Sequence, residues 1–301
     1  MTHVCFKCRG NLQSDFQKHG LHKNCFKEWF HLADEGEDFW NLILRQELSA
    51  HDKERSFKNT SFFHGKFKKY SAELGGKTYI LKMSPEYPEL AKTEYLCNQI
   101  GIAIGIDIPK NYLLTFQGQE NCFVSYNFMQ DFAGSNLEHI WHFLKPTESY
   151  NLETLVKIIE KQTQRLSEIQ KFIKVCLFDA LIGNHDRHGR NLGFISTSQG
   201  YIFSPCYDNP SYFGIADFLA AAHAPRCAIA TSSTEEPMMK EYIMEYRRLG
   251  FEDEIHEFKK CLDIEKLTSL INHSFLSEER KKAFLTFVER QYREVNYALS
   301  D

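Results

Sequence analysis

The sequence predicts an α+β protein with two lobes, a sheet-rich lobe followed by a mostly helical lobe, and a small Cys-rich N-terminal appendage. Its 301 residues fit one large domain or two lobes that share a cleft. Strand-like runs with hairpin turns dominate the first part of the chain, and apolar residues recur at helical spacing in the second. We place the Cys-rich segment at residues 1–48, the first lobe at 49–130 and the second at 131–301.

The composition excludes several classes of protein. Hydrophobic residues make up 43% and charged residues 25% of the chain, as in ordinary globular proteins, and 14% aromatic residues are too many for a disordered chain. Apolar runs fall short of the ~18 residues of a membrane span, and the first residues lack the apolar stretch of a secretory signal. We expect a cytoplasmic protein with no membrane association and, at a net charge of -4, no direct nucleic-acid binding. Delivery into a host cell as an effector leaves no trace in the sequence.

Two pairs of soft metal ligands stand out near the N-terminus. Two residues separate Cys5 from Cys8 and His22 from Cys25, and 13 residues lie between the pairs. These spacings are typical of a structural zinc site, with His19 as a substitute ligand. The alternative is that the three cysteines pack as reduced thiols and His22 lies at the surface. In neither case do we assign the segment a catalytic role.

The elements of the first lobe follow from local patterns. Closely spaced apolar residues over 37–48 favour a short helix, and 49–60 is a polar linker. Alternating runs then predict two hairpins, the first with a tight turn at Gly75 and Gly76. The strands of these hairpins are expected at 62–74 and 78–81, and at 112–116 and 122–126, with a helix over 90–100 between the hairpins.

The second lobe is expected to be mostly helical. Apolar residues at i, i+3, i+4 and i+7 from Ile169 to Leu181 predict a helix with one buried face, which ends at Gly183. Short strands are expected at 191–195 and 201–204. From Met238 to the end the pattern is again helical.

The densest group of chemically active residues follows Gly183. Asp186 precedes Asn191 by five positions, in a loop between an apolar helix and an apolar strand. Phosphoryl transfer needs such a pair, because a carboxylate orients the attacking hydroxyl and an amide oxygen holds a metal ion. Asp208 follows 17 residues after Asn191, where a second carboxylate can bind Mg²⁺.

A lysine upstream completes the pattern. Lys82 ends a predicted strand, from which it can reach the phosphates of a nucleotide, and Glu94 on the following helix can pair with it. Taken singly, each residue also suits a turn, a surface charge or a helix face. Together, Lys82, Asp186, Asn191 and Asp208 occur in protein-kinase order, which predicts a protein-kinase-like fold that uses ATP and Mg²⁺.

The stretches LIGNHDRHGRNLGFI and FSPCYDNPS resemble the HipA family of serine/threonine protein kinases. The resemblance implies that Asp186 is the catalytic aspartate, that His188 and Asn191 contact nucleotide and metal, that Asp208 is the second metal ligand, and that Lys82 binds the nucleotide. It further implies the toxin of a bacterial toxin–antitoxin system, which phosphorylates a translation component such as an aminoacyl-tRNA synthetase. The partner would be a small DNA-binding, HipB-like antitoxin. The adenine-binding hinge is expected near residues 124–128.

Two features depart from this family's pattern. Its phosphate-covering loop has a Gly-x-Gln-x-Lys core after a serine, whereas residues 61–69 read SFFHGKFKK. The phosphate lysine therefore has alternatives in Lys66, Lys68 and Lys69. An autophosphorylation site stays open among Ser56, Thr60 and Ser61. The chain is also short at its start, like HipT-type toxins, whose missing subdomain is supplied by a separate HipS-like protein.

Two other functions remain as hypotheses. A small-molecule or lipid kinase of related fold would use the same loop on a different acceptor. A pseudokinase that serves as an interaction module would explain the atypical loop at 61–69, although the intact Lys82, Asp186, Asn191 and Asp208 argue against it.

Overall fold

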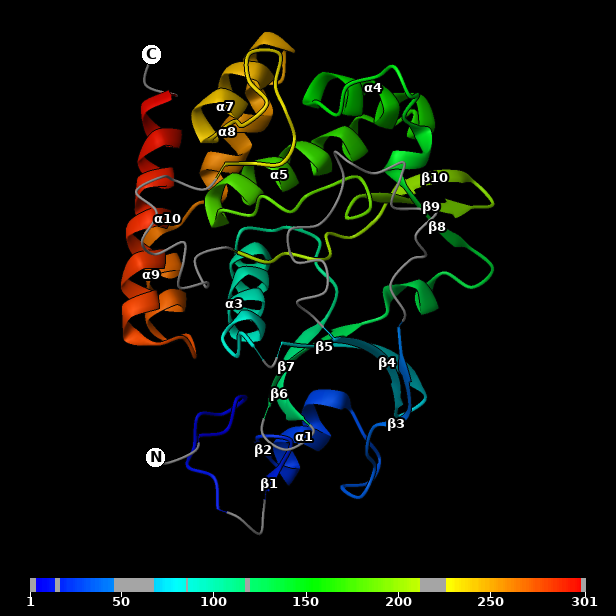
Figure 1. The fold of residues 1–301 in the computed structure, drawn as a ribbon, viewed down its shortest axis with the longest axis vertical. Coiled ribbons are helices and arrows are strands. Elements are labelled where there is room, and N and C mark those ends of the chain that lie inside the picture. The colour runs from blue at the N-terminus through cyan, green and yellow to red at the C-terminus, as the bar shows by residue number, and fades with distance from the viewer. Residues whose placement is uncertain are drawn as a thin grey trace.

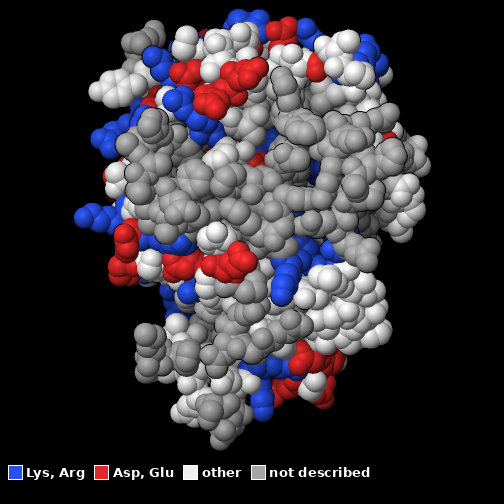
Figure 2. Space-filling view, in the orientation of Figure 1, with Lys and Arg blue, Asp and Glu red and all other residues white. Residues whose placement is uncertain are grey.

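A computed structural model describes residues 4–13, 17–45, 68–84, 86–116, 120–211 and 226–298, and its ribbon shows a sheet-rich lobe below a helical lobe (Figure 1). The predicted α+β architecture is therefore confirmed. Within the described ranges, every helix is too short or too polar to span a bilayer. On the face shown in Figure 2, basic and acidic side chains of the described residues are intermixed.

The sheet of the first lobe pairs its strands in the order β3-β4-β5-β7-β6, and every pair is antiparallel. Both predicted hairpins are present, and Gly75 and Gly76 adopt the left-handed φ angles of 55° and 71° that the tight first turn needs. The strands are β3 (Trp40–Leu44), β4 (Lys68–Leu74), β5 (Lys77–Met83), β6 (Asn111–Phe116) and β7 (Glu120–Tyr126). The linker at 49–60 and residues 62–67 of the first hairpin lie outside the described residues.

The short helix expected over 37–48 is wrong. Residues 40–44 form the edge strand β3, in which Trp40 pairs with Glu73 and Leu44 with Tyr70 of β4. The run WNLIL contains β-branched and aromatic residues and no helix-specific spacing. Pairing with the open edge of β4 therefore decides its conformation, because tertiary contacts override weak local propensity.

Helices cover both faces of this sheet (Figure 1). On one face, Leu113 and Phe123 pack with Ala91 of α3 (Leu90–Ala103). On the other, the neighbouring residues of β6 and β7 pack with Phe26 and Phe30 of α1 (Lys23–Phe30), because successive side chains of a strand point to opposite faces. The N-terminal segment, which also forms the hairpin of β1 (Gln17–Lys18) and β2 (Leu21–His22), thus shares the core of the sheet.

The second lobe is built around α5 (Leu166–Ile182), whose residues from Phe172 onward are almost all buried. A small sheet in the order β10-β9-β8 and short 3₁₀ helices link it to the first lobe. These elements are η2 (Phe128–Asp131), β8 (Asn136–His139), η3 (Ile140–Phe143), β9 (Gly193–Thr197) and β10 (Gly200–Phe203). The surrounding helices are α4 (Leu152–Thr163), α7 (Met239–Arg248), α8 (Glu252–Cys261), α9 (Ile264–Asn272) and α10 (Glu278–Ala298).

If the N-terminal segment is part of the sheet's core, truncating Phe30 should destabilise the whole lobe. Its ring is 2% exposed and contacts the rings of Tyr79 and Tyr112. We expect Phe30→Ala to lower the free energy of unfolding by about 3–5 kcal/mol, measured by urea titration. Trp40→Ala, which truncates a ring that is 59% exposed on the edge strand, should change it by less than about 0.5 kcal/mol. Equal effects of the two substitutions would contradict the shared core.

Candidate active site

Lys82 lies on β5 in the middle of the sheet and is 6% exposed. Its Nζ donates a hydrogen bond to Glu94 Oε1 of α3 at 2.6 Å, as the sequence predicted. It also donates to Asp208 Oδ1. One buried ammonium group therefore joins the sheet, α3 and the segment after β10.

Asp208 also forms an ion pair with a second lysine, Lys69. Lys69 lies opposite Lys82 in the register of β4 and β5, and its Nζ is 3.3 Å from Asp208 Oδ2. The backbone of Asp208 has a left-handed φ of 52°, which turns the chain after Tyr207. The sequence offers Lys68 and Lys69 as alternatives to Lys82 for the phosphate-binding lysine. Of these two, Lys69 forms an ion pair with Asp208. Lys66 lies outside the described residues.

These charges shift one another's pKa values. Burial opposes the charged form of Lys82, but the carboxylates of Asp208 and Glu94 raise its pKa above the usual value. Burial likewise acts against ionised Asp208, yet Lys69 and Lys82 hold its pKa well below the usual range. For Glu94, burial raises the pKa in spite of Lys82. The site is thus a compensated buried cluster in which Asp208 is ionised.

Asp186 lies in a loop that hydrogen bonds hold at both ends. Helix α5 ends at Gly183, whose φ of 69° is left-handed, and the Asn184 side chain accepts the Asp186 N–H at 2.9 Å. Asn191 Nδ2 donates to the Asp186 carbonyl oxygen at 2.9 Å. The backbone of Asp186 is therefore fixed on both sides, and this bond uses the nitrogen of the Asn191 amide and not its oxygen.

Arg187 connects this loop to the Asp208 segment, and the sequence reasoning missed it. Its guanidinium group is buried and makes a bidentate ion pair with Asp179 of α5, with both N–O distances at 2.8 Å. The same group donates to the carbonyl oxygens of Asn191 and Tyr207 and to Asn209 Oδ1. The signal in the sequence was Asp179 itself, a lone carboxylate in the apolar run CLFDALI.

A parallel set of bonds ties the same segment to α3. Asn209 Nδ2 donates to Asn98 Oδ1 at 2.9 Å, and Asn98 Nδ2 donates to the Glu94 carbonyl oxygen at 2.7 Å. The residues that follow Asp208 are therefore attached to the helix that carries Glu94, as well as to the loop that carries Asp186.

The two histidines of the loop favour the neutral form. Burial lowers the pKa of His188 to about 4, and the nearby Arg190 and Lys69 add to the effect of burial, whereas Asp208 opposes it. Burial also lowers the pKa of His185 to about 3. His188 Nδ1 accepts the backbone N–H of Arg190 at 3.2 Å, a bond that suits an uncharged ring.

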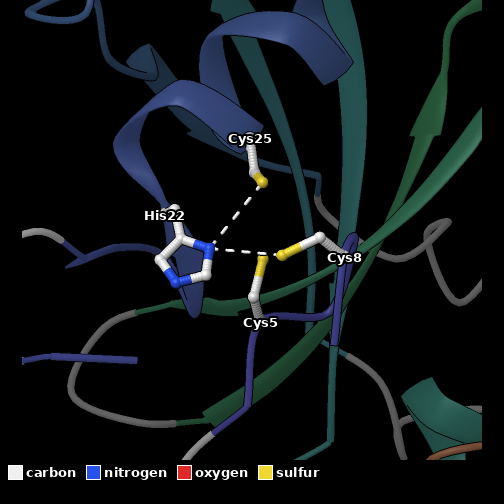
Figure 3. Close-up of side chains that lie close together, drawn as sticks. All are labelled: Cys5, Cys8, His22 and Cys25. Atoms are coloured by element: carbon white, nitrogen blue, oxygen red, sulfur yellow. Dashed lines mark hydrogen bonds between the residues drawn. The ribbon is translucent and has the colours of Figure 1, made fainter. Parts of the chain in front are cut away.

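The cysteine–histidine cluster predicted near the N-terminus also assembles. The side chains of Cys5, Cys8, His22 and Cys25 point toward one another (Figure 3). His19, the substitute ligand, lies elsewhere: its Nε2 is 2.6 Å from Asp38 Oδ1 and its Nδ1 is 3.2 Å from the Thr115 carbonyl oxygen. The phosphosite candidates Ser56, Thr60 and Ser61 lie outside the described residues.

A sheet-rich lobe, a helical lobe and this lysine–carboxylate cluster between them define a kinase-like fold. A family model, the HipA-like C-terminal domain, matches residues 61–249, and the chain belongs to this family. The resemblance found in the sequence is therefore confirmed.

Among solved structures, the chain is similar to the Helicobacter pylori proinflammatory kinase CtkA, with a TM-score of 0.65 and 19% identity over 79% of this chain and 93% of CtkA. It is also similar to HipA of a Shewanella oneidensis toxin–antitoxin system, which was crystallised with HipB and its operator DNA. In that case the TM-score is 0.55, with 15% identity over 76% of this chain and 60% of HipA. At such identities the likeness shows the fold alone.

A Haemophilus influenzae protein named only as a candidate kinase is 29% identical over 150 residues, which is 43% of this chain and 44% of that protein. The match thus spans less than half the length of this curated relative.

Removing the Arg187 guanidinium should leave Asp179 as an uncompensated buried charge. We expect Arg187→Met to lower the free energy of unfolding by about 3–5 kcal/mol, measured by urea titration. Adding Asp179→Leu should restore much of this loss, since the stranded carboxylate is then gone. The ion pair of Lys260 with Glu257 is exposed on both sides, which makes Lys260→Met a control with little expected effect. A double variant no more stable than Arg187→Met would contradict the pairing.

The lowered pKa of His188 predicts a pH dependence of stability. The unfolded chain binds a proton at His188 near pH 6.5, whereas the folded chain does so only near pH 4. The free energy of unfolding should therefore fall as the pH drops from about 6.5 to about 4, and His188→Gln should make this fall shallower. The exposed His256→Gln serves as the control. Parallel pH profiles for wild type and His188→Gln would contradict the burial argument.

Proposed function

We propose that the protein is an ATP- and Mg²⁺-dependent serine/threonine protein kinase of the HipA type. The observation that carries the proposal is the buried Lys82 ammonium group between Glu94 and Asp208. Protein kinases require a strand lysine paired with a helix glutamate, together with a metal-binding aspartate, before phosphoryl transfer occurs. Membership of the HipA-like family supports the same activity.

The residues of the site suit the roles that the sequence assigned to them. The Asp186 carboxylate would orient the substrate hydroxyl and accept its proton, from a loop whose backbone is fixed on both sides. Asp208 and the Asn191 amide oxygen would hold Mg²⁺, because both offer the hard oxygen atoms that this ion prefers. The bound metal would supply charge neutralisation at the phosphates. Neutral His188 would contact the nucleotide, and the backbone at 124–128, where β7 ends, would meet the adenine ring.

The lysines have a further part in this proposal. Asp208 gives one carboxylate oxygen to Lys82 and the other to Lys69. Mg²⁺ held by Asp208 would compete with the two lysines for these oxygen atoms, and an ammonium group so released would lie close to the phosphates. Lys82 would then bind the α- and β-phosphates while Glu94 keeps it in position.

The biological role proposed here is that of the toxin of a toxin–antitoxin system, acting on a translation component such as an aminoacyl-tRNA synthetase. Its partners would be a HipB-like antitoxin and a small HipS-like protein. The crystallisation of Shewanella oneidensis HipA with HipB and operator DNA supports such a partnership. Autophosphorylation at Ser56, Thr60 or Ser61 would be a means of silencing the enzyme.

The test is phosphoryl transfer from radiolabelled ATP to protein acceptors. Asp186→Asn and Asp208→Asn should each lower the rate by about 10²-fold or more, because each removes a charge on which positioning or metal binding depends. The exposed Asp253→Asn on α8 is the matched control and should keep the wild-type rate.

Other outcomes would overturn the proposal. Retained transfer in both Asp186→Asn and Asp208→Asn would refute the site. Transfer to lipid or aminoglycoside acceptors and not to protein would favour the small-molecule or lipid kinase. Nucleotide binding by the wild type without any turnover would favour the pseudokinase.

A further inference from the structure

The cysteine–histidine cluster has the dimensions of a site for one metal ion. The ligand atoms of its four residues all lie within 4.8 Å of one another. His22 Nδ1 is 3.3 Å from Cys8 Sγ and 3.8 Å from Cys25 Sγ. A tetrahedral zinc ion, with bonds of about 2.3 Å to sulfur and about 2.0 Å to nitrogen, places its ligand atoms about 3.5–3.8 Å apart. The cluster therefore fits a single zinc ion with little rearrangement.

The surroundings of the cluster orient its histidine as a ligand. The outer nitrogen of the ring, His22 Nε2, is 3.0 Å from the Asn11 carbonyl oxygen. A proton on Nε2 then leaves the lone pair of Nδ1 facing the thiols, which is the arrangement that metal-binding histidines use. Gly10 lies against the cluster, where a Cβ would be 3.3 Å from the His22 ring and 3.5 Å from Cys8 Sγ.

The alternative, a set of reduced thiols in the core, fits less well. Of the three cysteines, only Cys5 is fully buried, while Cys8 is exposed and Cys25 is partly exposed. An exposed thiol gains little hydrophobic stabilisation from packing beside a partly exposed imidazole. Three thiols and one imidazole are, however, a common ligand set of structural zinc.

The residues between the ligands contact the helical lobe. The Phe6 ring packs edge-on against Phe275, with 4.9 Å between centroids. The Arg9 guanidinium lies 4.6 Å above the same ring and donates a hydrogen bond to the His273 carbonyl oxygen. His273 and Phe275 belong to the connection between α9 and α10. The loop that carries Cys5 and Cys8 therefore reaches across to the second lobe.

The α9–α10 connection that Phe6 and Arg9 contact also packs against α3, the helix that carries Glu94. Phe275 packs on the cluster of Ala91, Leu113 and Phe123, where α3 meets the sheet. The same α9–α10 connection holds the start of α3, since Glu89 accepts the Ser277 N–H at 3.0 Å. The loop that carries Cys5 and Cys8 and the start of α3 therefore contact the same connection.

We propose that Cys5, Cys8, His22 and Cys25 bind one Zn²⁺ ion, and that this ion holds Phe6 and Arg9 against the α9–α10 connection. Bound zinc thus stabilises the contact between the N-terminal segment and the helical lobe, next to α3. The proposal is independent of the kinase activity proposed above, and neither experiment below measures phosphoryl transfer.

The first experiment measures the metal. Full-length protein purified under reducing conditions is analysed by elemental mass spectrometry, and Co²⁺ is exchanged into it. We expect one zinc per chain and a thiolate-to-cobalt charge-transfer band. Cys8→Ser should lose both, and Cys261→Ser, which removes a partly exposed thiol on α8, should keep both. Wild-type protein that lacks zinc and whose Cys5, Cys8 and Cys25 all react with an alkylating reagent overturns the site without any variant.

The second experiment tests whether zinc stabilises this contact. Removing zinc from the wild type with a chelator should speed amide hydrogen exchange about tenfold in residues 5–11 and 273–277 and leave α7 unchanged. The double variant Phe6→Ala and Arg9→Ala should keep its zinc and yet show the faster exchange at 273–277. Unchanged exchange at 273–277 after chelation, with zinc shown to be present before, overturns this part of the proposal.

Discussion

The Lys82 ammonium group is buried, and a buried charge is stable only where opposite charges compensate for the loss of water. Its two carboxylate partners come from different parts of the chain, Glu94 from α3 and Asp208 from the segment after β10. The cation can be neutralised on both sides only when the two lobes are close together. Assembly of the site and approach of the lobes are therefore one equilibrium.

The bond between Asn98 and Asn209 reinforces this coupling, because it joins the same two segments through neutral groups. The attraction between charges depends little on direction, whereas the amide hydrogen bond needs its donor and acceptor aligned, so it sets the register of the segment relative to α3. The kinase-like arrangement thus depends on a charged contact for its energy and on a neutral contact for its alignment.

What the sequence could predict were features that depend on short spacings. Gly75-Gly76 marked the first hairpin, the apolar period marked α5, and Cys5-x2-Cys8 marked the cysteine–histidine cluster. The pairing of Lys82 with Glu94 could also be predicted, since the two residues lie on consecutive elements of the chain. The strand β3 could not, because WNLIL becomes a strand only beside β4, almost thirty residues further on. Lys69 gains its role from Asp208, which is distant in sequence, so nothing local marks it. For Arg187 the one local sign was Asp179, a carboxylate in an apolar run eight residues earlier.

Arg187 has a consequence for how the molecule can move. One rigid planar group contacts α5, the Asp186 loop and the chain on both sides of Asp208. The loop that carries Asp186 and the segment that carries Asp208 are thus bonded to the same arginine and move together. A hinge motion that separated the two lobes would draw Lys82 away from Asp208 and leave the spacing between Asp186 and Asp208 unchanged. In the proposed kinase, such a motion would alter contact with the nucleotide and keep Asp186 in place for the acceptor hydroxyl.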